Sequence, residues 1–72
     1  MKYYIIASRH IPFNMEYQFV TDDSISKQEL KKWFKKEYCP NFFVKVKEVT
    51  RDDIDIFWEI YLTKKDGQIK CA

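Results

Sequence analysis

Few residues in this sequence have the chemistry that a catalytic site requires. Nucleophilic catalysis needs a nucleophile, a base and a third group that orients the base. The single histidine, His10, stands in a predicted turn beside Pro12, and neither cysteine is near it in the sequence. We therefore interpret His10 as an exposed turn residue and not as a catalytic base.

Four carboxylates stand close together in the second half of the chain: Asp52, Asp53, Asp55 and Glu59. Such groups perform general acid–base catalysis when a pocket separates their pKa values. The small fold predicted below offers little pocket, so the sequence favours structural roles. The first two carboxylates suit a turn, and the last two are expected to pair across strands with Lys45 or Lys47.

Metal and phosphate sites have no signature in the sequence. The two cysteines, Cys39 and Cys71, form no CxxC or histidine–cysteine pattern with the spacing of metal ligands. Gly67 is the only glycine, so a glycine-rich phosphate loop cannot be built. We interpret both cysteines as reduced, partly buried thiols. The sequence therefore predicts no enzyme, no cofactor and no metal.

The length of 72 residues predicts one small α+β domain, residues 1–72. Six Phe, five Tyr and two Trp supply large side chains for a core that few residues must fill. No stretch approaches the roughly 20 apolar residues of a membrane span, and the apolar run at the N-terminus stops at Ser8. The expectation is a cytoplasmic protein that does not enter a membrane.

The strongest local signal predicts a helix over residues 25–38. Ser26 can accept a hydrogen bond from the N–H of Glu29, whose carboxylate can reach back, which is a capping box. Pro40 disfavours any continuation. An apolar stripe follows helical spacing: Leu30, Trp33, Phe34 and Tyr38.

Five lysines occupy the remaining helix surface: Lys27, Lys31, Lys32, Lys35 and Lys36. The net charge of +2 is small, but these lysines and the aspartate cluster predict an electrically polarised molecule. The lysine face could follow a phosphate backbone, and the alternative is an ordinary solvated helix face. The absence of arginine on this helix counts against base-specific recognition.

Alternating side chains predict five strands, over residues 2–9, 13–21, 42–50, 54–63 and 68–71. Pro12 marks a turn between the first two, and Asp66-Gly67 marks a hairpin between the last two. The predicted order is ββαβββ, an antiparallel sheet with one helix packed on one face.

The alternation assigns side chains to the two faces of the predicted sheet. The inner face, against the helix, is expected to be Tyr3, Ile5, Met15, Tyr17, Phe19, Val44, Val46, Ile56, Trp58 and Ile60. The outer face is expected to be Tyr4, Ile6, Glu16, Gln18, Phe43, Lys45, Lys47, Phe57, Glu59 and Tyr61. Trp33 and Trp58 should both be buried, and nothing in the chain is left to cover the outer face.

The exposed sheet face is the second candidate binding surface, with Tyr4, Phe43, Lys45, Lys47, Phe57 and Tyr61. Aromatic residues beside lysines on a sheet can stack nucleic-acid bases. However, Glu16 and Glu59 on the same face would repel phosphate, and aromatic residues are enriched in protein interfaces. Contiguous exposed aromatic residues therefore favour a protein partner or self-association over nucleic acid.

The ending IFWEIYLTKKDGQIKCA combines an aromatic strand, an acidic–glycine turn and a short strand that ends in cysteine. With the short lysine-rich helix between strand pairs, this outline resembles very small phage-encoded proteins that inhibit host defences, including some type I anti-CRISPR proteins. The resemblance implies an inhibitor that docks on a nucleoprotein effector and blocks its nucleic-acid path. It assigns no role to any single residue.

Our hypothesis from the sequence is a non-enzymatic binding protein, encoded by a phage or mobile element, that inhibits a host protein or nucleoprotein complex. The alternative is a small nucleic-acid-binding protein that uses the lysine-rich helix and the aromatic sheet face. A homodimer, the identity of the partner and a role for Cys39 and Cys71 are left open.

Overall fold

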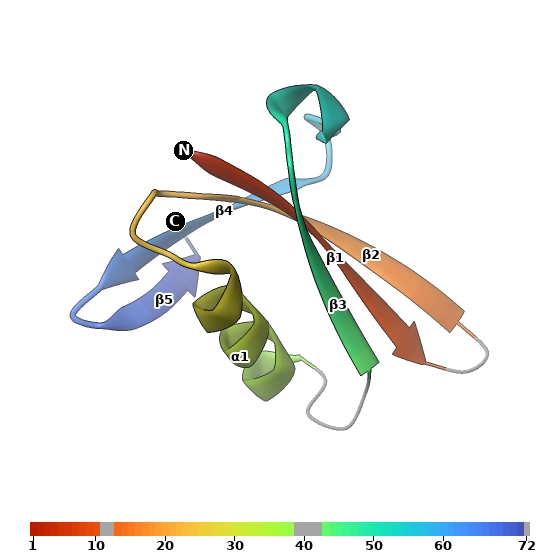
Figure 1. Cartoon of the computed structure of the whole chain (residues 1–72), viewed down its shortest axis with the longest axis horizontal. Helices are drawn as coiled ribbons and strands as arrows, with labels where there is room; N and C mark the ends of the chain where they lie inside the picture. The colour runs from red at the N-terminus through yellow and green to blue at the C-terminus, as the bar shows by residue number, and fades with distance from the viewer. Residues whose placement is uncertain (11–12, 39–42, 72) are drawn as a thin grey trace.

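The chain folds as one five-stranded sheet with an α-helix on one face (Figure 1). The computed structural model describes residues 1–10, 13–38 and 43–71. Their elements are β1 (Lys2–His10), β2 (Phe13–Thr21), α1 (Lys27–Glu37), β3 (Phe43–Val49), the 3-10 turn η1 (Arg51–Asp53), β4 (Glu59–Lys65) and β5 (Gln68–Cys71). The predicted α+β class, with five strands and one α-helix, is confirmed for these residues.

The sheet is mixed, with the strand order β3-β1-β2-β4-β5. β1 runs antiparallel to β2 and to β3, and β4 runs antiparallel to β5. β2 and β4 are parallel, and Phe19 lies opposite Ile60 in their register. The predicted ββαβββ antiparallel sheet is thus partly wrong, because the connection after β3 crosses to the far side of the β1–β2 hairpin and enters beside β2 in the same direction.

Helix α1 forms where its capping signal predicts. The Ser26 hydroxyl accepts a hydrogen bond from the N–H of Glu29 at 3.1 Å, and the N–H of Tyr38 closes the last turn on the carbonyl of Phe34. The predicted stop at Pro40 lies outside the described residues. Within those residues, no helix has the length and apolar character needed to cross a membrane.

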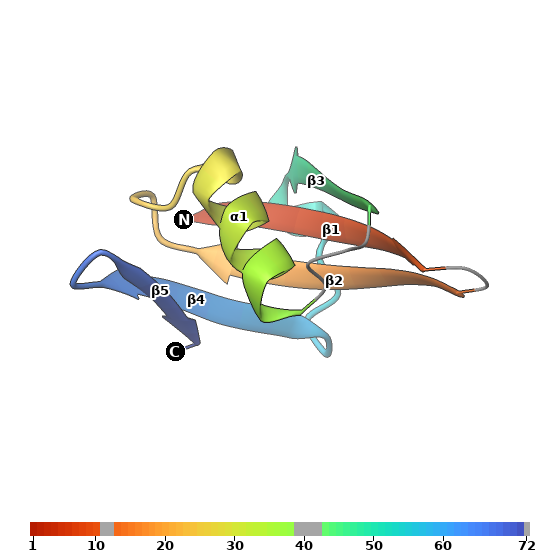
Figure 2. The same cartoon turned by 90° about the horizontal axis from the view of Figure 1, so that it is seen from below.

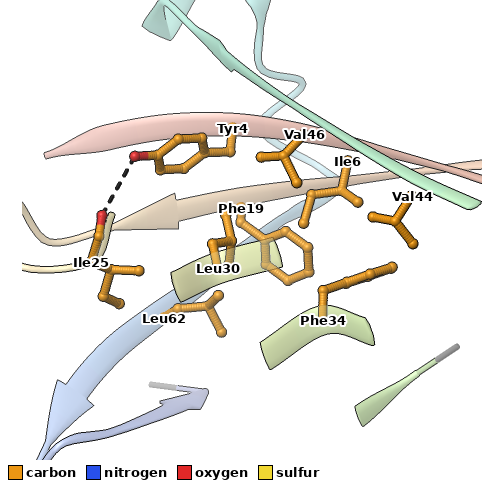
Figure 3. Close-up of a cluster of buried hydrophobic side chains, with 9 residues drawn as sticks. All are labelled: Tyr4, Ile6, Phe19, Ile25, Leu30, Phe34, Val44, Val46 and Leu62. Atoms are coloured by element: carbon orange, nitrogen blue, oxygen red, sulfur yellow. Dashed lines mark hydrogen bonds between the residues drawn. The ribbon is translucent and has the colours of Figure 1, made fainter. Parts of the chain in front are cut away.

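The core lies between α1 and the sheet (Figures 2 and 3). Leu30 and Phe34 are the buried residues of the helix, and Trp33 packs against them while staying partly exposed. The buried cluster consists of Tyr4, Ile6, Phe19, Ile25, Leu30, Phe34, Val44, Val46 and Leu62. Several aromatic rings pack edge to face here, with 5.1 Å between the centroids of Tyr17 and Phe34.

The predicted faces of β1 are reversed in the structure. Tyr4 and Ile6 are fully buried under the helix, whereas Tyr3 and Ile5 are on the opposite face and partly exposed. The register explains the reversal, because Tyr4 lies opposite Phe19 and shares its face. A strand that alternates apolar residues on both faces does not reveal which one is buried.

The predicted strand 54–63 begins five residues later than expected, at Glu59. Ile56 and Trp58, which were assigned to the inner face, are 63% and 72% exposed. Ile60 packs against the core as predicted, and Leu62 is buried. The cause is local: Asp55 accepts hydrogen bonds from the N–H groups of Phe57 and Trp58, which turns the backbone away from the sheet.

The face opposite α1 is not fully open, contrary to prediction. η1 and the residues after it pass over this face, seen behind the sheet in Figure 2. The Arg51 guanidinium lies 5.8 Å from the centre of the Tyr3 ring. Gln18 of β2 accepts a hydrogen bond from the backbone N–H of Asp55 at 2.6 Å. The connection is therefore attached to the sheet that it crosses.

These positions predict a large effect for one aromatic substitution and a small effect for another. Phe34→Ala should lower the free energy of unfolding by about 3–5 kcal/mol, because Phe34 is fully buried. Trp58→Ala should change it by less than about 0.5 kcal/mol, because most of that side chain is already in water. Guanidinium titrations followed by circular dichroism measure both. A large loss of stability in Trp58→Ala would contradict the exposed position of Trp58 and indicate that it belongs to the core.

Candidate functional site

Three consecutive large apolar residues of the described chain are strongly exposed at the turn before β4. We call Ile56, Phe57 and Trp58 the apolar tip; their exposed fractions are 63%, 88% and 72%. Single exposed apolar residues are ordinary, but a contiguous group of large ones marks an interaction site. The tip is thus the leading candidate for a functional surface.

Hydrogen bonds fix the backbone of the apolar tip. The N–H of Phe57 donates to the Asp55 carboxylate at 2.9 Å, and the N–H of Trp58 donates to the Asp55 carbonyl at 3.0 Å. The N–H of Asp55 itself donates to Gln18. The turn is therefore held at its base, so its three side chains are presented with a small entropic cost of ordering on binding.

An ion pair joins the two ends of the connection beneath the tip. Arg51 Nη1 lies 2.6 Å from Glu59 Oε2, and the Glu59 side chain is only 6% exposed. The Tyr61 hydroxyl also donates to this carboxylate. Tyr61 and then Arg51 lower the pKa of Glu59, and the same hydrogen bond raises the pKa of Tyr61. The prediction that Glu59 pairs with Lys45 or Lys47 is wrong, because Arg51 occupies that role.

Three exposed carboxylates lie in the connection that leads into the tip. We call Asp52, Asp53 and Asp55 the acidic collar. Asp53 accepts hydrogen bonds from the N–H and hydroxyl of Thr50 at 3.1 and 3.0 Å, and the backbone bond is the first cause that lowers its pKa. The predicted turn role of Asp52 and Asp53 is confirmed by η1. The apolar tip thus follows an acidic stretch of exposed chain.

The six residues assigned to one sheet face do not form one surface. Tyr4 is buried on the helix side, where its hydroxyl donates to the carbonyl of Ile25 at 3.4 Å (Figure 3). Phe57 belongs to the tip and not to a strand. Tyr61 is 44% exposed on β4. The remaining three are exposed on the edge strand β3: Phe43, Lys45 and Lys47.

The predicted lysine face exists on α1. Lys35 is partly exposed, and four lysines are exposed: Lys27, Lys31, Lys32 and Lys36. Within the part of the chain that the structure describes, none of the five takes part in an ion pair. Glu29 of the same helix instead accepts from Lys64 of β4 at 2.7 Å, and this hydrogen bond is the main cause that lowers its pKa.

A groove runs between α1 and β5. Trp33 and Ile69 supply its apolar floor, and its two adjoining hollows measure about 410 and 370 Å³. We call it the α1–β5 groove; its polar rim includes Lys32, Lys36, Glu37, Gln68 and Lys70. This groove could not be predicted from the sequence, because it depends on which strand lies beside the uncovered flank of the helix.

Side chains that could bind a metal ion are not gathered together in the described part of the chain. Among residues 1–10, 13–38 and 43–71, no group of three His, Cys, Asp or Glu residues could hold a metal ion. Cys71 is a free thiol, and it is exposed where partial burial was predicted. Cys39 lies outside the described residues, as does the side chain of His10.

The apolar tip was missed by sequence reasoning because Ile56 and Trp58 continue the alternation of β4. The available signal was Asp55, whose side chain favours a turn.

A search against family models, curated proteins and solved structures finds no match to this chain. The function of the protein is therefore inferred from the geometry of its own surfaces.

The ion pair beneath the tip predicts a pH dependence. The pKa of Glu59 is lower in the folded state, so its contribution to stability is present near neutral pH and is lost as the pH falls below about 4. Glu59→Gln should therefore be less stable than the wild type at pH 7, with the difference shrinking towards pH 2. Unfolding titrations at both pH values measure this.

Glu16→Gln is the matched control, since Glu16 is exposed on the same face and has no ion pair within the described chain. It should leave the stability unchanged at pH 7. Equal stability of Glu59→Gln and wild type at pH 7 would contradict the role of the Arg51–Glu59 pair.

Proposed function

We propose that this protein is a non-enzymatic protein-binding module and that the apolar tip is its anchor. The observation that carries the proposal is the exposure of three consecutive large apolar side chains on a backbone fixed by hydrogen bonds. Binding energy in protein interfaces concentrates in a few aromatic anchors that fill pockets on the partner. Phe57 and Trp58 are such anchors here.

The acidic collar favours a protein over the other classes of partner. Asp52, Asp53 and Asp55 repel the phosphates of nucleic acid and of anionic lipid headgroups, which are attracted by positive charge. A protein pocket with an apolar floor and a basic rim satisfies both the tip and the collar. Charge complementarity of this kind sets the orientation and the rate of association.

The resemblance to small phage-encoded inhibitors supports a finer form of the proposal. In that form, a phage or mobile element encodes the protein, and its target is a host protein or nucleoprotein defence complex. The tip would then block a surface that the complex needs for its nucleic acid, with no chemistry required of the inhibitor. A basic rim is expected on such a target, because nucleic-acid paths are lined by lysine and arginine.

Phe57→Ala tests the anchor directly. Captured from bacterial lysate treated with nuclease, a stoichiometric partner of the tagged wild type should bind this variant about 30-fold more weakly, a loss of about 2 kcal/mol. The fold should persist, because Phe57 is 88% exposed. Quantitative pull-downs followed by calorimetry with the isolated partner measure the change.

Phe43→Ala is the matched control, since Phe43 is also an aromatic residue, 72% exposed, but lies on β3. It should retain the affinity of the wild type. Loss of binding in Phe43→Ala with normal binding in Phe57→Ala would move the site to the face of β3.

A nucleic-acid-binding protein is the second candidate, and it is favoured by the lysines of α1, none of which takes part in an ion pair among the described residues. If these lysines contact phosphates, the logarithm of affinity should fall linearly with the logarithm of salt concentration, by about 0.7–0.9 per contact. Lys31→Ala should then reduce the slope by one contact, while Lys65→Ala on β4 should not. Fluorescence anisotropy with a labelled oligonucleotide measures this. A flat salt dependence would dispose of the candidate.

A further inference from the structure

The α1–β5 groove has the properties that the apolar tip requires of a receptor. Its floor is apolar, formed by Trp33 and Ile69. Three lysines that take part in no ion pair within the described chain stand on its rim: Lys32, Lys36 and Lys70. The 410 Å³ hollow is within the size range of sites that hold a compact apolar group.

The charge of the groove is positive after its acidic residues are considered. Glu29 also lines it, but Lys64 neutralises that carboxylate at 2.7 Å. Glu37 is the remaining carboxylate among the described lining residues, against three lysines. An occupant with carboxylates around an apolar centre therefore fits this groove better than a basic one.

Packing of aromatic rings forms the floor of the groove before any occupant binds. The Trp33 ring lies edge to face with Phe19, with 5.7 Å between centroids, and edge to face with Tyr38 at 5.6 Å. Its position is thus set by the core and by the end of the helix. A preformed floor of this kind loses little conformational freedom when it is covered.

The tip and the groove cannot meet within one molecule. The base of the tip is attached to Gln18, on the face of the sheet opposite α1, whereas the groove lies on the helix side (Figures 1 and 2). We propose that the apolar tip of one copy seats in the α1–β5 groove of a second copy, with the acidic collar against the groove lysines. This rests on the proposed function, since it names a partner for the same tip.

The contact joins two different surfaces. Exchanged reciprocally between two copies it closes an isologous dimer, and made once per pair it is heterologous and extends head to tail. Three tip side chains bury too little area for a standard interface, because each aromatic side chain buries about 150–250 Å². The association is therefore weak and depends on concentration, and it hides the tip from a foreign partner when the protein is abundant.

Sedimentation velocity on the full chain, from about 10 μM to about 1 mM, tests the contact over the range of weak association. The weight-average sedimentation coefficient of the wild type should rise with concentration. Phe57→Ala, which removes the tip, should stay monomeric. Lys32→Glu/Lys36→Glu, which reverses the groove charge, should also stay monomeric. Both variants keep the fold because all three side chains are exposed.

Mixing the two variants gives the decisive result. Phe57→Ala still has an intact groove and Lys32→Glu/Lys36→Glu still has an intact tip, so the equimolar mixture should form a dimer that neither variant forms alone. Lys27→Glu/Lys31→Glu is the matched control, since it makes the same charge change on α1 outside the groove. It should associate like the wild type.

A wild type that stays monomeric over the whole range overturns this inference but leaves capture of a foreign protein by the tip intact. Self-association that survives in Lys32→Glu/Lys36→Glu, or a mixture that stays monomeric, also overturns the groove assignment. In the converse outcome, the wild type self-associates as expected while no other protein is captured through Phe57. That result counts against the proposed function and supports the second copy as the occupant of the groove.

Discussion

The constraint on which this structure depends is the path from β3 to β4. These strands stand at positions one and four of the sheet, so the chain must cross β1 and β2, about 14 Å at the usual spacing of strands. Residues 50–58 make this crossing and could span roughly 30 Å if fully extended. The excess length is taken up by η1 and the turn at Asp55, which lifts three apolar residues off the sheet.

The same crossing explains the polar contacts on the face opposite the helix. Arg51 at its start and Glu59 at its end form an ion pair, and Gln18 holds its middle through the backbone of Asp55. The ion pair joins residues on either side of the turn, and the Gln18 hydrogen bond joins the turn to a distant strand. Together they fix the position of the turn relative to the sheet. The apolar tip is thus positioned by a scaffold, as binding residues on loops commonly are.

The parts of the fold that could be predicted are those set by local signals. Helix α1 begins at a capping serine and is stabilised by a stripe at helical spacing, and both features are visible within a dozen residues. The faces of β1 could not be predicted, because Tyr3 and Ile5 are as apolar as Tyr4 and Ile6. Their assignment depends on pairing with β2 and β3, which is tertiary information.

The candidate site was harder to predict for the same reason. Ile56 and Trp58 extend the alternation of β4, and only the hydrogen bonds of Asp55 distinguish a turn from a strand there. The parallel pairing of β4 with β2 was also beyond a local argument, since a short antiparallel hairpin is the simpler expectation for consecutive strands. Charge was more informative, because the exposed lysines and aspartates occupy the helix and the crossing that their sequence positions suggested.

Exposure of the tip has an energetic consequence in a chain of this size. Leaving a large apolar side chain in water forgoes about 1.5–3 kcal/mol of burial, so three forgo an amount comparable with the 5–15 kcal/mol that stabilises a whole domain. A partner that covers the tip returns part of this free energy, and it does so only for the folded state. Binding therefore stabilises the fold by mass action. The surface that makes the isolated chain less stable than it could be is the same surface that we propose as its binding site.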